Sequence, residues 1–263
     1  MRCVITFLCL AIFSLTAAAQ QEDFVPIAYA NGLLGGVVKG KWLSGQEVAP
    51  LLKEKTEFVI VGLKGVEKTG AIFGSKGEEF GACPDVTSIN FEPKNESSLA
   101  VGANAKWNLV PRIAKFNALT DKTSVKIAAA FLKTKSIVKA KVKLTQAFSV
   151  DLDGDGQNER IIVGNYYKRG MMEEPGAGDY SFVLLRKTVK GKPQNILLEG
   201  DFFTRKGEYA PPNEREISAV ADLDGDGNME IVLHGYYYEG DWSIVFQLKE
   251  NKAIKVLEVD CGL

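Results

Sequence analysis

The sequence predicts an α+β protein, with a small mixed N-terminal domain followed by a duplicated antiparallel β-meander that is either propeller-blade-like or a sandwich. Three observations support this prediction. Helical spacing of apolar residues is confined to short stretches, strand-like alternation dominates the second half, and one acidic nine-residue segment occurs twice. A chain of 263 residues with 46% hydrophobic and 25% charged side chains has the composition of a globular protein.

The first residues have the pattern of a secretory signal peptide. Arg2 precedes an apolar run from Val4 to Leu15, and small residues then lead to Ala19. The apolar run is shorter than the roughly 20 residues that cross a membrane. We therefore expect cleavage after Ala19, removal of residues 1–19, and a secreted or periplasmic mature chain without a membrane span.

Export changes the meaning of the cysteines. Cys3 and Cys9 leave with the signal peptide, so Cys83 and Cys261 remain. In an oxidising compartment these two have one intramolecular pairing available. Such a disulfide would close a loop of about 180 residues and tie the C-terminus to the N-terminal half. Two buried free thiols are the alternative.

Residues 20–118 read as the mixed α/β N-terminal domain. Ser44, with Glu47 three residues later, is a capping-box signature and predicts a short helix. Further along, the pattern predicts strands at residues 58–61 and 71–74 and a polar loop at 84–98 that contains the glycosylation acceptor Asn95. The sequence assigns no purpose to this domain.

Residues 119–137 form the predicted linking helix, because Val125, Ala128 and Leu132 fall on one face. Lysines are frequent here, but from Val138 onward they alternate with apolar residues, as on the solvated face of a strand. The whole chain has 32 basic and 33 acidic side chains, which gives no global field to attract nucleic acid. We expect no nucleic-acid partner.

Residues 138–263 form the predicted duplicated β domain, with repeats at 138–204 and 213–263. The segment from Asp151 to Glu159 recurs 71 residues later, from Asp222 to Glu230. The residues after each segment are also similar. Each copy therefore reads as strand, acidic loop, strand, hairpin, strand, turn and strand.

In each acidic loop the carboxylates stand at positions 1, 3, 5 and 9, and glycine stands at position 6. Four neighbouring carboxylates repel one another, and such hard oxygen ligands suit Ca²⁺, which coordinates flexibly at about 2.3–2.6 Å. The glycine allows the backbone to curl around an ion. We therefore expect two Ca²⁺ sites. The expected ligands are Asp151, Asp153, Asp155, Glu159 and the carbonyl of Gln157 for the first ion, and Asp222, Asp224, Asp226, Glu230 and the carbonyl of Asn228 for the second.

An EF-hand would carry glutamate at position 12 and continue into a helix, but Ile162 and Leu233 stand there and strand-like residues surround them. The loops instead resemble those of FG-GAP and VCBS-type repeats of secreted bacterial proteins, and the calcium loops of integrin α-chain propellers. The resemblance covers about residues 138–263. It implies calcium at the positions above, extracellular exposure, and adhesion or ligand binding. A closed propeller needs at least four blades, so a sandwich, an open barrel and a propeller fragment all remain open.

The leading expectation is a secreted or periplasmic, calcium-stabilised binding or structural module for a protein or carbohydrate ligand, and not an enzyme. The single histidine, His234, reads as a strand side chain, which argues against a catalytic triad. Outward-facing rings among residues 236–238 could bind a ligand. One alternative is an exported hydrolase that uses carboxylates, with Glu173, Glu174 or Asp179 as the acids. Another is an envelope-assembly or inhibitor protein that acts through its N-terminal half.

Overall fold

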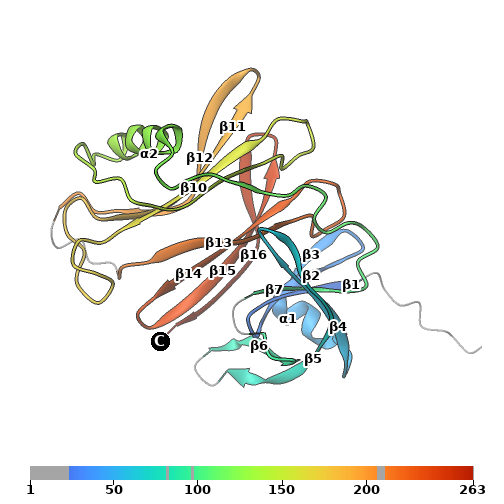
Figure 1. The fold of residues 1–263 in the computed structure, drawn as a ribbon. Coiled ribbons are helices and arrows are strands. Elements are labelled where there is room, and N and C mark those ends of the chain that lie inside the picture. The colour runs from blue at the N-terminus through green and yellow to red at the C-terminus, as the bar shows by residue number, and fades with distance from the viewer. Residues whose placement is uncertain (1–23, 81–82, 96–97, 206–210, 263) are drawn as a thin grey trace, which may run out of the picture.

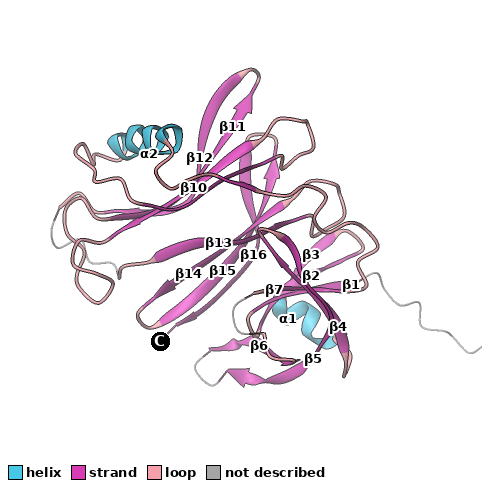
Figure 2. Cartoon of the chain, viewed as in Figure 1, coloured by secondary structure: helices cyan, strands magenta, loops and turns pink. Residues whose placement is uncertain are grey.

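The computed structural model describes residues 24–80, 83–95, 98–205 and 211–262, and it is mostly β, with 55% strand and 9% helix (Figures 1 and 2). The predicted α+β class is therefore wrong. The helices in those ranges are the single-turn α1 (Gly45–Val48), which continues into a 3₁₀ turn (Ala49–Leu51), and α2 (Lys122–Thr134). The predicted signal peptide lies outside the described residues.

The N-terminal part is a closed barrel. Its strands are β1 (Phe24–Tyr29), β2 (Gly32–Val38), β3 (Lys41–Ser44), β4 (Thr56–Gly62), β5 (Gly65–Phe80), β6 (Cys83–Glu92) and β7 (Leu99–Gly102). The order is β1-β7-β4-β5-β6-β2-β3, and pairing of β1 with β2 closes six of the strands, leaving β3 attached to β2. The segment predicted as a loop at 84–98 is largely β6, because Val86, Ile89 and Phe91 between polar residues face the interior.

The helix signals in the sequence are confirmed. Ser44 caps α1: its hydroxyl accepts a hydrogen bond from the Glu47 N–H, and the Glu47 carboxylate accepts one from the Ser44 N–H at 2.8 Å. The linking helix is α2, and Asp121 caps it by accepting from the Ser124 N–H at 2.9 Å. The strand expected from Val138 begins only at Leu144, and Val138 is exposed.

The rest of the chain forms two antiparallel sheets. The first meander sheet contains β8 (Lys115–Phe116), β9 (Leu144–Val150), β10 (Glu159–Tyr166), β11 (Tyr180–Val189) and β12 (Lys192–Phe202), and the second contains β13 (Glu214–Ala221), β14 (Glu230–Tyr237), β15 (Gly240–Lys249) and β16 (Lys252–Gly262). Within each sheet, β9 to β12 and β13 to β16 pair in chain order. One acidic loop joins β9 to β10, and the other joins β13 to β14.

The second meander sheet is the middle layer of the molecule. Side chains of a strand point alternately to its two faces. On β14, Ile231 and Leu233 therefore pack against the first meander sheet, whereas Val232 packs against the barrel. On the outer face of the first sheet, α2 buries Leu132 and Phe131 among side chains of β9, β10 and β11. The layers are thus α2, the first sheet, the second sheet and the barrel (Figure 1).

The predicted disulfide between Cys83 and Cys261 is confirmed, with a Cα–Cα distance of 5.5 Å. It joins β6 of the barrel to β16 at the edge of the second meander sheet. The barrel and the last strand of the chain are therefore covalently tied across 178 residues of sequence.

Candidate metal sites

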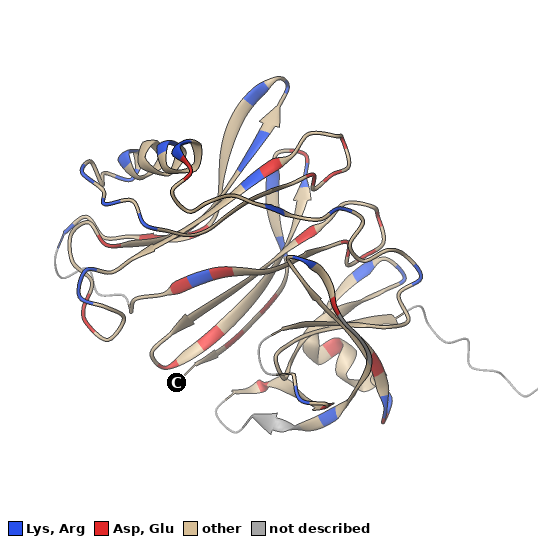
Figure 3. Cartoon of the chain, in the orientation of Figure 1, with Lys and Arg blue, Asp and Glu red and all other residues tan. Residues whose placement is uncertain are grey.

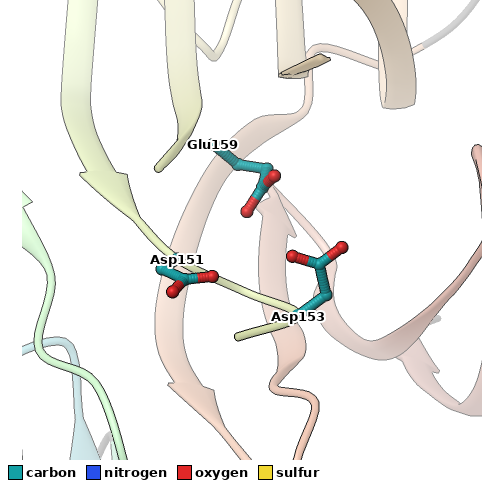
Figure 4. Close-up of side chains that lie close together, drawn as sticks. All are labelled: Asp151, Asp153 and Glu159. Carbon is teal, nitrogen blue, oxygen red and sulfur yellow. The ribbon is translucent and has the colours of Figure 1, made fainter. Parts of the chain in front are cut away.

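Each acidic loop gathers three carboxylates into one cluster. Within a cluster, one oxygen from each residue lies within 4.8 Å of the others, so either cluster could hold a metal ion. The first cluster is Asp151, Asp153 and Glu159, and the second is Asp222, Asp224 and Glu230. In the first, the three carboxylates point toward one another from the loop and from the start of β10 (Figure 4).

The first aspartate of each loop shapes the backbone. Asp151 accepts hydrogen bonds from the N–H groups of Gly154, at 2.8 Å, and Gly156, at 3.1 Å. Both glycines have positive φ, 73° and 85°, a conformation that side-chain-bearing residues rarely adopt. Asp222 makes the same two contacts in the second loop, at 2.7 and 3.1 Å. Sequence reasoning identified only the glycine at position 6, although the glycine at position 4 follows an aspartate in both copies.

The glutamate at position 9 enters from the buried start of the next strand. Glu159 accepts a hydrogen bond from the Leu152 N–H at 2.8 Å, and Glu230 accepts one from the Leu223 N–H at the same distance. Each bond uses the Oε2 oxygen and leaves Oε1 free for another partner. The two leucines are fully buried, so they anchor the loops in the core.

The aspartates at position 5 lie outside the clusters. Asp155 and Asp226 are exposed, and each accepts a hydrogen bond from a backbone N–H two residues later, at 2.7 Å, from Gln157 and Asn228 respectively. The structure therefore brings together three of the four carboxylates predicted for each ion. A ligand role for these two aspartates, or for the carbonyls of Gln157 and Asn228, stays a prediction.

The two loops differ at a position that sequence reasoning missed. On β11, Arg186 pairs with Arg160 of β10. The next residue of β11, Lys187, therefore lies beside Glu159, the first residue of β10. Its ammonium contacts the carboxylates of Asp153 and Glu159, the latter at 3.2 Å. In the second sheet the register places Gln247 opposite Glu230. The amide of Gln247 donates to Asp224 at 2.7 Å.

The pKa values of the two buried glutamates reflect this difference between Lys187 and Gln247. Burial raises the pKa of Glu230 to about 9, and the charge of Asp224 adds to that rise. Burial also raises the pKa of Glu159, but there the Leu152 N–H and the Lys187 ammonium oppose the rise. Burial works against the charge of Lys187, yet its bond to Asp153 and the charge of Glu159 hold its pKa above the usual value.

Each cluster keeps one buried oxygen without a hydrogen bond, Asp153 Oδ1 in the first and Glu230 Oε1 in the second, but only the first has an ammonium beside it. Glu230 is 0% exposed, and its Oε1 makes no hydrogen bond. None of the ion pairs among the described residues involves the second cluster. A buried carboxylate in this state is costly unless a cation neutralises it. This orphaned oxygen fits a metal ligand.

The segment that leaves the barrel after β7 holds both loops. The indole N–H of Trp107 donates to the Asp222 carbonyl at 2.8 Å, and the Asp222 N–H donates to the Leu109 carbonyl at 2.8 Å. Arg112 then bridges the two loops, with bonds to the carbonyls of Leu152, at 3.0 Å, and Gly227, at 2.8 Å. The loops are therefore neighbours and are fixed to the barrel through one connection.

The acids of the hydrolase alternative have other contacts. Asp179 is buried, and it accepts hydrogen bonds from the N–H groups of Lys168 and Gly176, at 3.0 and 2.8 Å, so it shapes the long hairpin. Glu173 lies 3.9 Å from Arg169 on the exposed surface. Glu173 and Asp179 are therefore accounted for by contacts within the hairpin.

The structure also places the histidine, the tyrosines and the glycosylation acceptor that the sequence analysis named. His234 lies on β14, as predicted, and stacks on Tyr29 with ring centroids 4.5 Å apart. Tyr236 and Tyr238 are exposed, in agreement with outward-facing rings. Asn95 is buried, and its amide donates to the carbonyls of Ala30 and Ser98, which removes it as an accessible glycosylation acceptor.

Basic and acidic residues are interspersed along the chain, with Lys and Arg positions on α2 and on the β11–β12 hairpin and Asp and Glu positions in the loops (Figure 3). No helix in the described part of the chain is long and apolar enough to cross a membrane. Comparison with known proteins finds no matching family model, and no curated protein or solved structure that matches significantly. The resemblance to FG-GAP and VCBS-type repeats stays a prediction carried by the two loops.

Proposed function

We propose that the protein is a secreted or periplasmic, calcium-stabilised binding or structural module of the FG-GAP/VCBS-like type. The observation that carries this proposal is the buried carboxylate of Glu230, whose Oε1 has no partner although Asp222 and Asp224 lie within the same 4.8 Å cluster. Three converging carboxylates with an unsatisfied buried oxygen favour a bound cation over an acidic turn that binds nothing.

The donor set favours calcium among the common metals. Both clusters offer only carboxylate oxygens, and neither contains the histidine or cysteine that zinc sites favour. Calcium accepts six to eight oxygens in irregular geometry, whereas magnesium demands a near-ideal octahedron. The side chains that would hold the ion are already oriented, because Asp222 and Glu230 each bind loop N–H groups. Bound calcium would supply positive charge to the loop, which makes its role structural.

Export is supported by the disulfide as well as by the signal pattern. A long-range pair such as Cys83 and Cys261 is typical of oxidising compartments. Extracellular modules commonly bind calcium with dissociation constants of about 10⁻⁴–10⁻³ M. A weak structural calcium site is therefore in keeping with a chain that works outside the cytoplasm.

A recess at one end of the two meander sheets supports ligand binding. It has a volume of about 360 Å³, and it lies between the long β10–β11 hairpin and the β14–β15 turn. Its lining includes Met172, Pro175, Pro212 and Tyr238, with Glu239 at its side. An exposed ring beside apolar and acidic groups suits a sugar or a peptide ligand.

Calorimetry and thermal melting of the mature chain test the proposal. We expect calcium to bind and to raise the melting temperature, and Asp224→Asn to remove most of both effects. Asp241→Asn makes the same charge change at an exposed position on β15 and should keep the calcium response. Equal melting temperatures in chelator and in millimolar calcium, together with no heat of binding, would overturn the proposal.

A further inference from the structure

The two acidic loops are nearly identical in sequence but differ in what faces them from the neighbouring strand. We propose that the first loop carries its own cation, the Lys187 ammonium, and that the chain binds a single divalent ion with high affinity, at the second loop. This inference rests on the proposed function, since it decides how many of the two loops use calcium.

In the first cluster the ammonium stands among the carboxylates. Lys187 is 7% exposed, and its Nζ contacts both Asp153 and Glu159. The carboxylate oxygens that could hold a metal lie within 4.8 Å of one another, so an ion among them would stand beside this ammonium. Like charges at such separation repel strongly where water is excluded. A divalent ion would have to displace the lysine before it could bind.

The backbone position of Lys187 on β11 holds its side chain at the cluster. Pairing of β10 with β11 runs from Tyr166 and Tyr180 to Arg160 and Arg186, and Lys187 is the next residue of β11 after this ladder. Its neighbour on the other side, β12, pairs with Lys187 through Gln194. The backbone of Lys187 is therefore held by β12 and by the adjoining ladder, and its side chain is buried at 7% exposure.

In the second cluster the corresponding side chain is neutral. Gln247 is also buried, and its amide satisfies one oxygen of Asp224 at 2.7 Å without bringing a positive charge. Glu230 keeps an unpartnered, fully buried Oε1. In the first cluster Asp153 Oδ1 is also buried without a hydrogen bond, but the other oxygen of that carboxylate contacts the Lys187 ammonium. The two loops therefore differ in whether a protein cation faces the carboxylates. The cation that Lys187 supplies in the first loop must come from solution in the second.

The number of ions bound per chain tests the inference. Native mass spectrometry and calcium calorimetry on the mature, disulfide-bonded chain should give one tightly bound ion. Lys187→Gln makes the first loop like the second, and we expect two ions. Gln247→Lys makes the second loop like the first, and we expect calcium affinity there to fall at least tenfold.

Two further variants keep the result interpretable. Lys187→Arg retains the positive charge and should remain at one ion, while Lys192→Gln removes an exposed lysine nearby and should also remain at one. Circular dichroism checks that each variant is folded, and a misfolded Lys187→Gln leaves the test to Gln247→Lys. Two ions of comparable affinity in the unaltered chain, or an unchanged affinity in Gln247→Lys, would overturn this inference alone. Absence of binding in every chain would overturn the proposed function with it.

Discussion

Replacing the two equivalent glutamates by glutamine should have opposite effects in the presence of a chelator. Glu230→Gln replaces a buried carboxyl whose pKa is raised to about 9, so that without metal it must take up a proton to stay buried at neutral pH. Glutamine keeps the shape and can still accept the hydrogen bond from the Leu223 N–H. Glu159→Gln instead removes the negative charge that forms an ion pair with Lys187, whose Nζ lies 3.2 Å from Glu159 Oε1. The first change should therefore stabilise the metal-free chain, and the second should destabilise it.

The expected changes in the free energy of unfolding follow from the surroundings of the two glutamates. Each pKa unit corresponds to about 1.4 kcal/mol, so the cost of holding Glu230 protonated at neutral pH, which Glu230→Gln removes, is up to about 3 kcal/mol. A hydrogen bond between charged groups contributes about 1.5–3 kcal/mol, which is the loss expected for Glu159→Gln. In a chain of this length, 1 kcal/mol moves the melting temperature by about 2–4 °C. Calcium at ten times its dissociation constant adds about 1.4 kcal/mol to the unaltered chain and should add little to Glu230→Gln.

Urea unfolding at neutral pH, with chelator and with calcium, measures both effects on the same samples. The Glu230→Gln chain should be the more stable one in chelator and should lose that advantage as calcium rises. Circular dichroism in the native baseline shows whether the sheets are intact. If both variants shift the unfolding midpoint in the same direction in chelator, the assignment of Lys187 as the partner of the first loop alone is wrong.

Three other predictions concern the framework. Cys261→Ser should lower the free energy of unfolding by up to about 5 kcal/mol in urea, because the disulfide closes a loop of 178 residues, and a reducing agent should then have no further effect. Burial lowers the pKa of His234, so the folded chain takes up its proton less readily than the unfolded chain, and stability should fall as pH drops through about 6.5, less so in His234→Gln. Leu132→Ala should cost about 2–5 kcal/mol in the same assay, whereas Lys133→Ala on the exposed side of α2 should cost little.

The sequence shows the helices, the capping residues and the disulfide well, because these signals are local or depend on very few residues. It misleads about the class of the N-terminal part. In β6, polar residues such as Thr87, Ser88 and Asn90 alternate with Ile89 and Phe91, and with two prolines nearby the segment looks like a loop. Only closure of the barrel gives the apolar residues an interior to face, and closure depends on pairings between distant strands.

The difference between the two loops was hidden by strand register. A Gly-Asp pair follows each acidic loop, Gly178-Asp179 in the first copy and Gly240-Asp241 in the second, and these pairs align Gly178 with Gly240. In the structure Gly178 ends a long loop, whereas Gly240 already pairs with Tyr237 in β15. The sequence comparison is therefore displaced by two residues from the structural one. With the structural register, Lys187 corresponds to Gln247, an exchange that the local pattern does not reveal.

The second acidic loop and the disulfide lie at opposite ends of the second meander sheet. At the loop end, Trp107 from the segment that leaves the barrel donates a hydrogen bond to the carbonyl of Asp222, eight residues before the buried Glu230 begins β14. At the other end, Cys261 is bonded to Cys83 of the barrel. Attachment at two separated points opposes both sliding and rotation of the barrel over the sheet. An ion in this loop would therefore stabilise the interface between barrel and sheet, and the disulfide acts on the same interface from the far side.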